Sequence, residues 1–180
     1  MSELLDRESL LDLLSDLAER LDARGVTLEI YVVGGTAMTL AYDRERLTRD
    51  IDATWDTSTD VSAEIDAIAA ERGLPRDWLN DRVRPMLPLV VDEDRMEALD
   101  LPGLRVSVAS PRHLLAMKAR AARDSRDLDD LILLCGHLQI TSVAEVIAIA
   151  EDVWGSGMLR DDTVFALRTG LAERGLDLGA

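Results

Sequence analysis

The chain has 180 residues, of which 47% are hydrophobic and 31% charged, and its formal net charge at pH 7 is −15. This composition is typical of one folded globular domain and excludes a disordered chain. The charge argues against tight nonspecific binding to DNA or RNA, because the overall potential repels phosphate; a nucleic-acid substrate would need a local basic patch or a basic partner.

Targeting and redox signals are few. No apolar run approaches the roughly 20 residues that a membrane span needs, and the N-terminal segment is amphipathic rather than signal-like. The one cysteine, Cys135, lies in an apolar run, so we expect a small buried residue and no disulfide framework. His113 and His137 have no zinc partner at ligand spacing. We expect a cytoplasmic protein with no membrane partner.

Hydrophobic periodicity and turn signals predict a mixed α/β region followed by an all-helical region. Helices are predicted over residues 3–24, 36–42, 60–72, 77–81 (one turn), 110–123, 125–137, from 142 onward, and 159–174. Strands are predicted over residues 27–33, 50–55, 86–91 and 104–108. The expected fold class is α/β (α+β), with a small mixed sheet backed by helices and then a C-terminal helical bundle. We expect a single domain over 1–180, with a sheet core over about 25–110 and a helical part over about 110–180.

Two stretches carry the candidate chemistry. The first strand ends in Gly34-Gly35-Thr36 and a helix start, which predicts a phosphate site made of backbone N–H groups, with the Thr36 hydroxyl as a further donor. In the second strand, Asp50 and Asp52 are two residues apart and therefore project from the same face. Two like charges on one face favour a bound divalent cation such as Mg²⁺ or Mn²⁺. A phosphate site beside paired carboxylates indicates nucleotidyl transfer.

These residues also resemble a known family. Gly34-Gly35-Thr36-Ala37 followed by Asp50-Ile51-Asp52 resembles the signature of the polymerase-β-like nucleotidyltransferase superfamily. Lys118 followed by Arg126-Asp127-Leu128-Asp129-Asp130 is similar to a motif of its AbiEii/MenT-type branch, and residues 78–81 resemble a segment of uncharacterised members. The likeness covers roughly residues 25 to 140.

The resemblance implies roles for particular residues. Asp50 and Asp52 would hold Mg²⁺, and Gly34, Gly35 and Thr36 would bind the triphosphate of an NTP. Lys118 would be a second phosphate contact, with a surface lysine paired to a neighbouring acid as its alternative. Residues Asp127 and Asp130, three apart on a helix, would orient Lys118 or the acceptor or act as a base; the alternative is a solvated acidic face. Asp130 matches the second acid of the motif.

Other positions are less determined. The superfamily often uses a third carboxylate; Asp92, Asp94 and Asp100 are nearby, but none lies in a clear strand pattern. Trp55 and Trp78 could stack on a base, although burial is the safer interpretation. Two sets of basic residues are candidates for an RNA patch or a mixed-charge surface: Arg44, Arg46 and Arg49, and Arg112, Lys118, Arg120, Arg123 and Arg126.

Three functions remain in view. The first is a metal-dependent nucleotidyltransferase that moves an NMP from an NTP to an acceptor hydroxyl. By resemblance, that acceptor could be a tRNA 3′ end and the protein a toxin paired with an antitoxin protein. The second is transfer to a protein side chain, as in antitoxin-like nucleotidyltransferases, which the acidic charge mildly favours. The third is a non-catalytic interaction protein that retains this fold.

Overall fold

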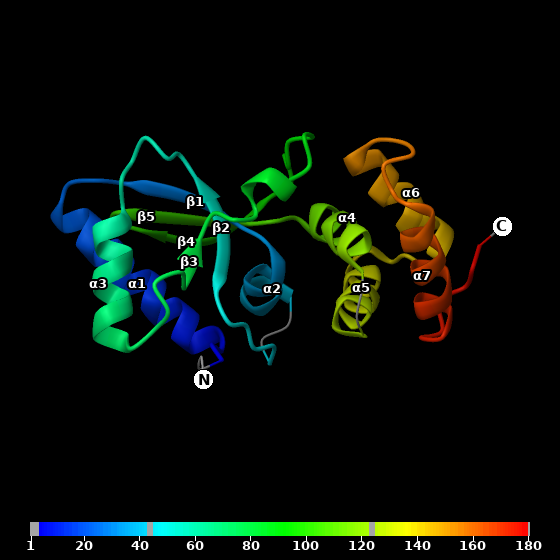
Figure 1. The fold of residues 1–180 in the computed structure, drawn as a ribbon, viewed down its shortest axis with the longest axis horizontal. Helices are drawn as coiled ribbons and strands as arrows, with labels where there is room; N and C mark the ends of the chain where they lie inside the picture. Colours follow the sequence, from blue (N-terminus) through cyan, green and yellow to red (C-terminus); the bar gives the residue numbers. More distant parts are fainter. Residues whose placement is uncertain (1–3, 43–44, 123–124, 180) are drawn as a thin grey trace. The chain divides into compact units, whose positions relative to one another are not determined.

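The computed structural model describes residues 4–42, 45–122 and 125–179, which form a mixed α/β fold with one five-stranded sheet (Figure 1). This confirms the expected fold class. The chain divides into two compact units. The first, here the sheet unit, comprises Met1–Met86 and Arg95–Val108. The second, the helical unit, comprises Leu87–Asp94 and Ala109–Ala180.

The sheet mixes parallel and antiparallel neighbours in the order β3-β2-β1-β5-β4. β1 pairs with β5 in parallel and with β2 antiparallel, β2 pairs with β3 in parallel, and β4 pairs with β5 antiparallel. The strands are β1 (Leu28–Val32), β2 (Ile51–Trp55), β3 (Leu79–Asn80), β4 (Met96–Leu101) and β5 (Leu104–Val108).

One face of the sheet is apolar and the other is polar. In β1, Leu28, Ile30 and Val32 are buried, whereas Glu29 is exposed and Tyr31 is half-buried. The same alternation in β2 and β5 follows from the opposite directions of successive strand side chains. Helix α1 (Arg7–Ala23) contacts β5, and α3 (Ser62–Arg72) lies against α1 (Figure 1). The other side is named the polar face, and its residues on β1, β2 and β5 are Glu29, Tyr31, Asp52, Thr54, Arg105 and Ser107.

A glycine fixes how closely the β4–β5 hairpin approaches α1. Gly103 has φ +85°, and a Cβ atom there would lie 2.4 Å from the Ala18 carbonyl oxygen and 2.6 Å from the Asp22 nitrogen. The Gly103 carbonyl also accepts a hydrogen bond from the Leu28 N–H at 2.9 Å. Only glycine permits both the left-handed backbone and this contact, so the turn positions β5 against β1 and α1.

The helical unit contains α4 (Pro111–Ala121), α5 (Ser125–Leu138), α6 (Val143–Trp154) and α7 (Asp161–Ala172). Its predicted start signals are confirmed: the Ser110 hydroxyl accepts from the His113 N–H, and Ser142 and Glu145 form both bonds of a capping box. Cys135 is buried as expected, and burial raises the pKa of its thiol to about 11. In the part of the chain that the structure describes, no helix is long and apolar enough to cross a membrane.

Three sequence predictions differ from the structure. Residues 77–81 are not a helical turn, because β3 forms there by pairing with β2. Residues 86–91 are not a strand: Arg84–Met86 is a 3-10 helix, Leu89 beyond Pro88 is fully exposed, and the segment is outside the five-stranded sheet that the described residues form. Strand β4, which lies at the edge of the sheet, was not predicted from the sequence. Its pairing with β5 shifts register between Glu97 and Leu99, and this shift disrupts the alternation that would have indicated a strand.

The helix after the glycines also differs in detail. α2 (Gly34–Ala37) begins two residues before the predicted start at residue 36, and it continues as a π-helix, η1 (Met38–Tyr42). Gly34 itself has φ +64°, a backbone conformation that favours glycine. The glycines are therefore part of the helix start rather than a separate loop before it.

Candidate active site

The glycine bend is joined to the start of β2 by short hydrogen bonds within the sheet unit. The Val33 N–H donates to the Asp52 carbonyl at 3.0 Å. The Asp50 carbonyl accepts from the Thr36 hydroxyl at 2.6 Å and from the Thr48 hydroxyl at 3.2 Å. These bonds fix the backbone of both aspartates beside the bend. Thr36 is buried, and its hydroxyl serves this contact, so its place in the site is to position Asp50.

The bend and the second aspartate face each other closely. A Cβ atom on Gly34 would lie 3.4 Å from Asp52 Oδ2, and one on Gly35 would lie 3.0 Å from Thr48 Oγ1. Ile51 and Ala53 are buried, whereas Asp50 and Asp52 are half-buried. The carboxylate of Asp52 therefore lies close to the glycine bend, and a side chain at residue 34 would contact it.

Burial and the neighbouring acids make the ionised form of Asp50 unfavourable. Burial is the largest cause that raises the pKa of the Asp50 carboxyl group, followed by the negative charges of Asp52 and Asp77. Arg82 and Arg49 act in the opposite direction but do not reverse the shift. Arg82 is itself paired with Asp77, which limits its effect on Asp50. An added cation would relieve this repulsion.

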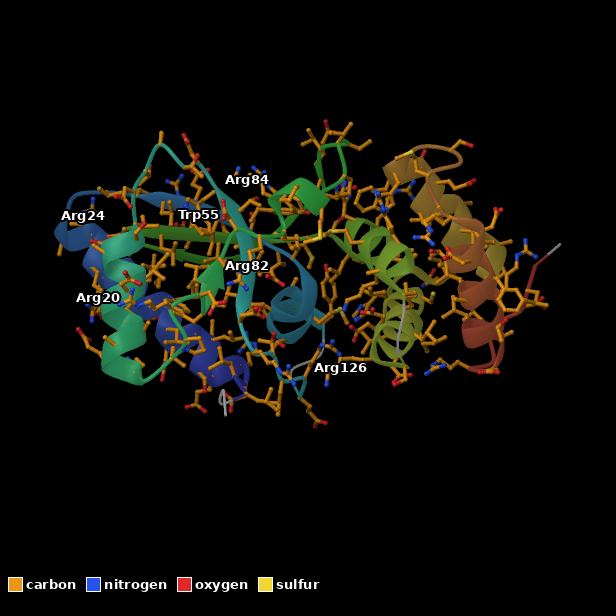
Figure 2. All side chains as sticks on the ribbon, viewed as in Figure 1. Arg20, Arg24, Trp55, Arg82, Arg84 and Arg126 are labelled. Carbon is orange, nitrogen blue, oxygen red and sulfur yellow. The ribbon has the colours of Figure 1, made fainter. Side chains whose placement is uncertain are left out.

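Residues of the β3 segment complete the surroundings of the acid pair; in the sequence, residues 78–81 indicated only a resemblance, and Asn80, Arg82 and Arg84 had no predicted role there. Asn80 on β3 is in register with Asp52 on β2, and its side-chain oxygen accepts from the Arg82 N–H at 3.2 Å. Figure 2 shows Arg82 and Arg84 close to β2, where the Arg84 guanidinium donates to the Trp55 carbonyl at 2.5 Å. No local signal identifies these residues, because they reach the site through a two-residue strand pairing.

The two tryptophans considered for base stacking, Trp55 and Trp78, have structural positions in the sheet unit. Trp78 is fully buried, and its indole N–H donates to the Ile65 carbonyl at 3.0 Å. Trp55 is half-buried at the end of β2, in register with Ile30. Ile30 belongs to the apolar face, so Trp55 lies on the side opposite the carboxylate of Asp52.

The donor set fits a divalent cation bound by two carboxylates. Within residues 4–42, 45–122 and 125–179, no three His, Cys, Asp or Glu side chains lie close enough together to hold a metal ion. Mg²⁺ does not require more, since it commonly takes one or two carboxylates and completes its shell with water and substrate phosphates. Asp50 and Asp52 match that pattern, and burial among negative charges gives them a reason to bind a cation.

Of the three candidates for a further carboxylate, Asp92 and Asp100 have other contacts and Asp94 is exposed. Asp92 is buried in the helical unit, where it accepts from the Ser110 N–H at 2.8 Å and faces His113 Nδ1 at 3.2 Å. Asp94 is exposed in the same segment. Asp100 lies on β4, 3.5 Å from the Arg105 guanidinium.

A second charged cluster lies in the helical unit. The ammonium group of Lys118 on α4 is 2.9 Å from Asp127 Oδ1 and 2.8 Å from Asp130 Oδ2, both on α5. Asp130 is 4% exposed, and the Lys118 side chain is also largely buried. The structure thus brings together the three residues of the Lys-to-Asp motif, as a buried ion cluster rather than a solvated acidic face.

Some of the basic residues considered for an RNA patch contact other side chains of the helical unit. Arg112 pairs with Asp152, and the Arg120 guanidinium lies 4.1 Å from the centre of the Trp154 ring. Arg126 is exposed on α5 (Figure 2). Arg44 and Arg123 lie outside the described residues.

Comparisons with known proteins identify a family for the chain. The family described as "Nucleotidyltransferase of unknown function (DUF6036)" matches residues 8–158, which is most of the chain. Among solved structures, the chain is similar to an antigenic nucleotidyltransferase-like protein from Paracoccidioides brasiliensis. The identity is 15%, the TM-score is 0.47, and the match covers 99% of this chain and 97% of that one. No curated protein matches the sequence significantly.

Proposed function

The chain belongs to this family of nucleotidyltransferases of unknown function, and on that premise we propose that it is a metal-dependent nucleotidyltransferase. It would move a nucleoside monophosphate from an NTP to an acceptor hydroxyl. One observation carries the proposal: two half-buried aspartates, with the pKa of Asp50 raised, stand beside a glycine bend that the carboxylate of Asp52 faces. The finer assignment to the AbiEii/MenT-type branch rests on the Lys118-to-Asp130 motif.

Each group of the sheet unit has a part in the proposed chemistry. Asp50 and Asp52 would hold Mg²⁺ or Mn²⁺, which when bound offsets charge on the attacking and leaving oxygens of the transfer. The backbone N–H groups at the start of α2 would donate to the triphosphate, since the first N–H groups of a helix have no partner within it. The hydroxyls of Thr36 and Thr48 hold the Asp50 backbone in place for this.

Lys118 is proposed as a second phosphate contact on the strength of the motif alone. Its ammonium group already has two carboxylate partners, so it would bind phosphate as one member of a cluster with net negative charge. The same contacts support a purely structural role. Variants that preserve the fold separate the two roles, as described in the Discussion.

The acceptor is proposed to be a tRNA 3′ end, with the protein as a toxin that an antitoxin protein controls; this rests on the resemblance to the AbiEii/MenT-type branch. Transfer to a protein side chain is a second candidate. The net charge of −15 favours it, since that charge repels RNA. Incubation with labelled NTPs, total tRNA and total protein distinguishes them by where the label appears.

The decisive experiment compares Asp52→Asn with Asp66→Asn, which removes a carboxylate from the exposed side of α3. Asp52→Asn should lower transfer by about 10³-fold or more, because several kcal/mol of metal-assisted stabilisation is lost. Asp66→Asn should transfer at the wild-type rate, and both variants should give the wild-type circular dichroism spectrum. Full activity of Asp52→Asn would refute the mechanism. Failure of the wild-type protein to bind any Mg·NTP in calorimetry would favour a non-catalytic interaction protein.

A further inference from the structure

A polar groove lies on the polar face of the sheet unit, and its lining residue Thr54 on β2 follows Asp52 by two positions. Its volume is about 570 Å³. Residues of three neighbouring strands line it, and residues of the loops beside them contribute charged and hydroxyl groups. Its lining includes the polar side chains of Tyr31, Thr54, Ser107, Glu29, Arg105 and Arg95.

The strand register places the groove next to Asp52. Tyr31 on β1 is paired with Thr54 on β2 and with Ser107 on β5, so these three side chains form one row across the sheet. Asp52 precedes Thr54 by two residues on the same face of β2. At the usual rise of a strand, the two Cα atoms are about 7 Å apart. A group bound over this row could therefore place a hydroxyl near a phosphate held at Asp52.

The positively and negatively charged side chains that line the groove are equal in number. Two arginines, Arg95 and Arg105, line it together with two acids, Glu29 and Asp56. The Arg105 guanidinium is already 2.9 Å from Glu29 Oε1. A run of nucleic-acid phosphates would need an excess of positive charge, which the groove does not offer. A neutral ligand with many hydrogen-bonding groups suits it better.

The hydroxyl groups and the aromatic ring define that ligand further. The Thr54 hydroxyl can both donate and accept, whereas the Ser107 hydroxyl donates to the Ile30 carbonyl at 3.2 Å and offers a ligand an acceptor. The acids and arginines beside them supply further acceptors and donors. The ring of Tyr31 offers an apolar surface between the two hydroxyls. Sugar rings combine an apolar face with hydroxyls that act as donor and acceptor at once.

We propose that this groove is the acceptor subsite and that it binds a sugar ring with neighbouring hydroxyl groups. The inference rests on the proposed function and specifies its acceptor. One sugar hydroxyl attacks the α-phosphorus of the NTP, a new O–P bond forms, and the bond to the β-phosphate oxygen breaks. Pyrophosphate leaves with the electron pair, and the hydroxyl proton passes to solvent. The ring belongs either to a free nucleoside or monosaccharide, or to the terminal ribose of an RNA.

A binding experiment tests the groove independently of catalysis. The ¹⁵N-labelled full-length protein is titrated with adenosine and, as a matched ligand, with 2′,3′-dideoxyadenosine, which lacks both ribose hydroxyls. Adenosine should shift the amide signals of Tyr31, Thr54 and Ser107, and the dideoxy compound should shift them much less. Equal shifts with both ligands, or shifts only outside these strands, would overturn the proposal.

A kinetic experiment then separates the groove from the donor site. Arg95→Gln and Thr54→Val should each raise the KM for the acceptor by about ten-fold, the effect of a lost hydrogen bond, and leave the KM for NTP unchanged. Arg72→Gln is the control, because Arg72 lies on α3 with a partner on α1. If the acceptor KM is unchanged in both groove variants, the groove is not the acceptor subsite, and the proposed nucleotidyl transfer is unaffected. Adenosine binding at the groove without transfer to any hydroxyl would refute the proposed function and keep the groove as a sugar site.

The same variants identify the source of the sugar. The acceptors compared are adenosine, ribose, an RNA that ends in a 3′-hydroxyl and the same RNA with a 3′-phosphate. Label on the 3′-hydroxyl RNA alone, with its KM raised in Arg95→Gln, supports a terminal ribose. Label on adenosine or ribose with the same dependence supports a free sugar. Label on protein side chains alone would overturn the sugar subsite.

Discussion

The two acidic clusters of this protein, Asp50 with Asp52 in the sheet unit and Asp127 with Asp130 in the helical unit, share a pattern but differ in their cations. In the helical unit, the spacing of three residues on α5 brings the two carboxylates to one face, whereas in the sheet unit Asp52 lies in β2 and Asp50 just before it. Asp127 and Asp130 have the ammonium group of Lys118 within 2.9 Å. At Asp50, burial, Asp52 and Asp77 raise the pKa against the weaker influence of Arg82 and Arg49. The helical cluster contains its own cation, the ammonium group of Lys118. The repulsion between Asp50 and Asp52 would instead be offset by a cation bound from solution.

This contrast shows how to distinguish a structural ion cluster from a metal site. A buried carboxylate with a lysine partner stabilises a fold as long as both partners are present. A carboxylate whose pKa is raised by burial and by neighbouring acids lowers the stability of the folded protein while it is ionised. A bound cation would offset that loss. The three predictions below test this contrast, and their expected effects decrease in order.

The largest effect is expected from Lys118→Met, which leaves Asp127 and Asp130 without their cation. Removing one partner of a buried ion pair costs about 3–5 kcal/mol in the free energy of unfolding, or roughly 10 °C in Tm for a chain of this size. Urea denaturation measures the loss. Arg160→Met is the control: Arg160 forms an exposed pair with Asp162 in the same unit, and its removal should cost under about 1 kcal/mol.

A second variant assigns the role of the cluster. Lys118→Met combined with Asp130→Asn should recover part of the lost stability, because the uncompensated buried charge is removed. If this folded double variant still transfers nucleotide at the wild-type rate, Lys118 acts in stability rather than in phosphate binding. A loss of under about 1 kcal/mol in Lys118→Met alone would contradict the assignment of a buried cluster.

An intermediate effect is expected from Gly34→Ala, with Gly25→Ala as a matched control. Both glycines have left-handed backbones, φ +64° and φ +68°, so each substitution should cost about 1–2 kcal/mol of stability. Only at Gly34 would the new Cβ approach Asp52, at 3.4 Å, whereas at Gly25 it meets no heavy atom within 4 Å. Gly34→Ala alone should therefore raise the KM for NTP, on the order of ten-fold. Equal kinetic effects in both variants would mean that the bend acts only through stability.

The smallest effect is expected from Asp50→Asn in protein freed of divalent cations. Because the pKa of Asp50 is raised in the fold, its ionised form lowers the stability of the wild-type protein at neutral pH. Asp50→Asn should raise Tm by about 1–2 °C there. Added Mg²⁺ should stabilise the wild-type protein more than the variant.

The sign of the pH dependence follows from the same shift. Above the raised pKa, the folded wild-type protein bears the full cost of the ionised Asp50. As the pH falls through that pKa toward the ordinary value of 3.8, the folded state retains the proton more readily than the unfolded chain, and the cost disappears. The Tm advantage of Asp50→Asn should therefore shrink on acidification. A constant advantage from neutral to acidic pH would contradict the cause assigned to the shift.

Local patterns predicted much of the fold and the parts of the candidate site that depend on adjacent residues. The capping box at Ser142 and the cap at Ser110 depend on residues three positions apart, so the sequence alone shows them. The glycine bend and the alternation around Ile51 are equally local. Neither β3 nor β4 was predicted. β3 is only two residues long, and β4 carries a register shift at the edge of the sheet.

The sequence by itself predicted that two acids two residues apart lie near a bend that favours glycine, since side-chain direction and backbone freedom depend on adjacent residues. Only the tertiary structure decided which neighbours those acids have. Asp77 and Arg82 reach Asp50 through the pairing of β2 with β3, and Lys118 reaches Asp130 through the packing of two helices. Strand order and helix packing depend on the burial of the whole chain, so no short stretch of sequence contains them.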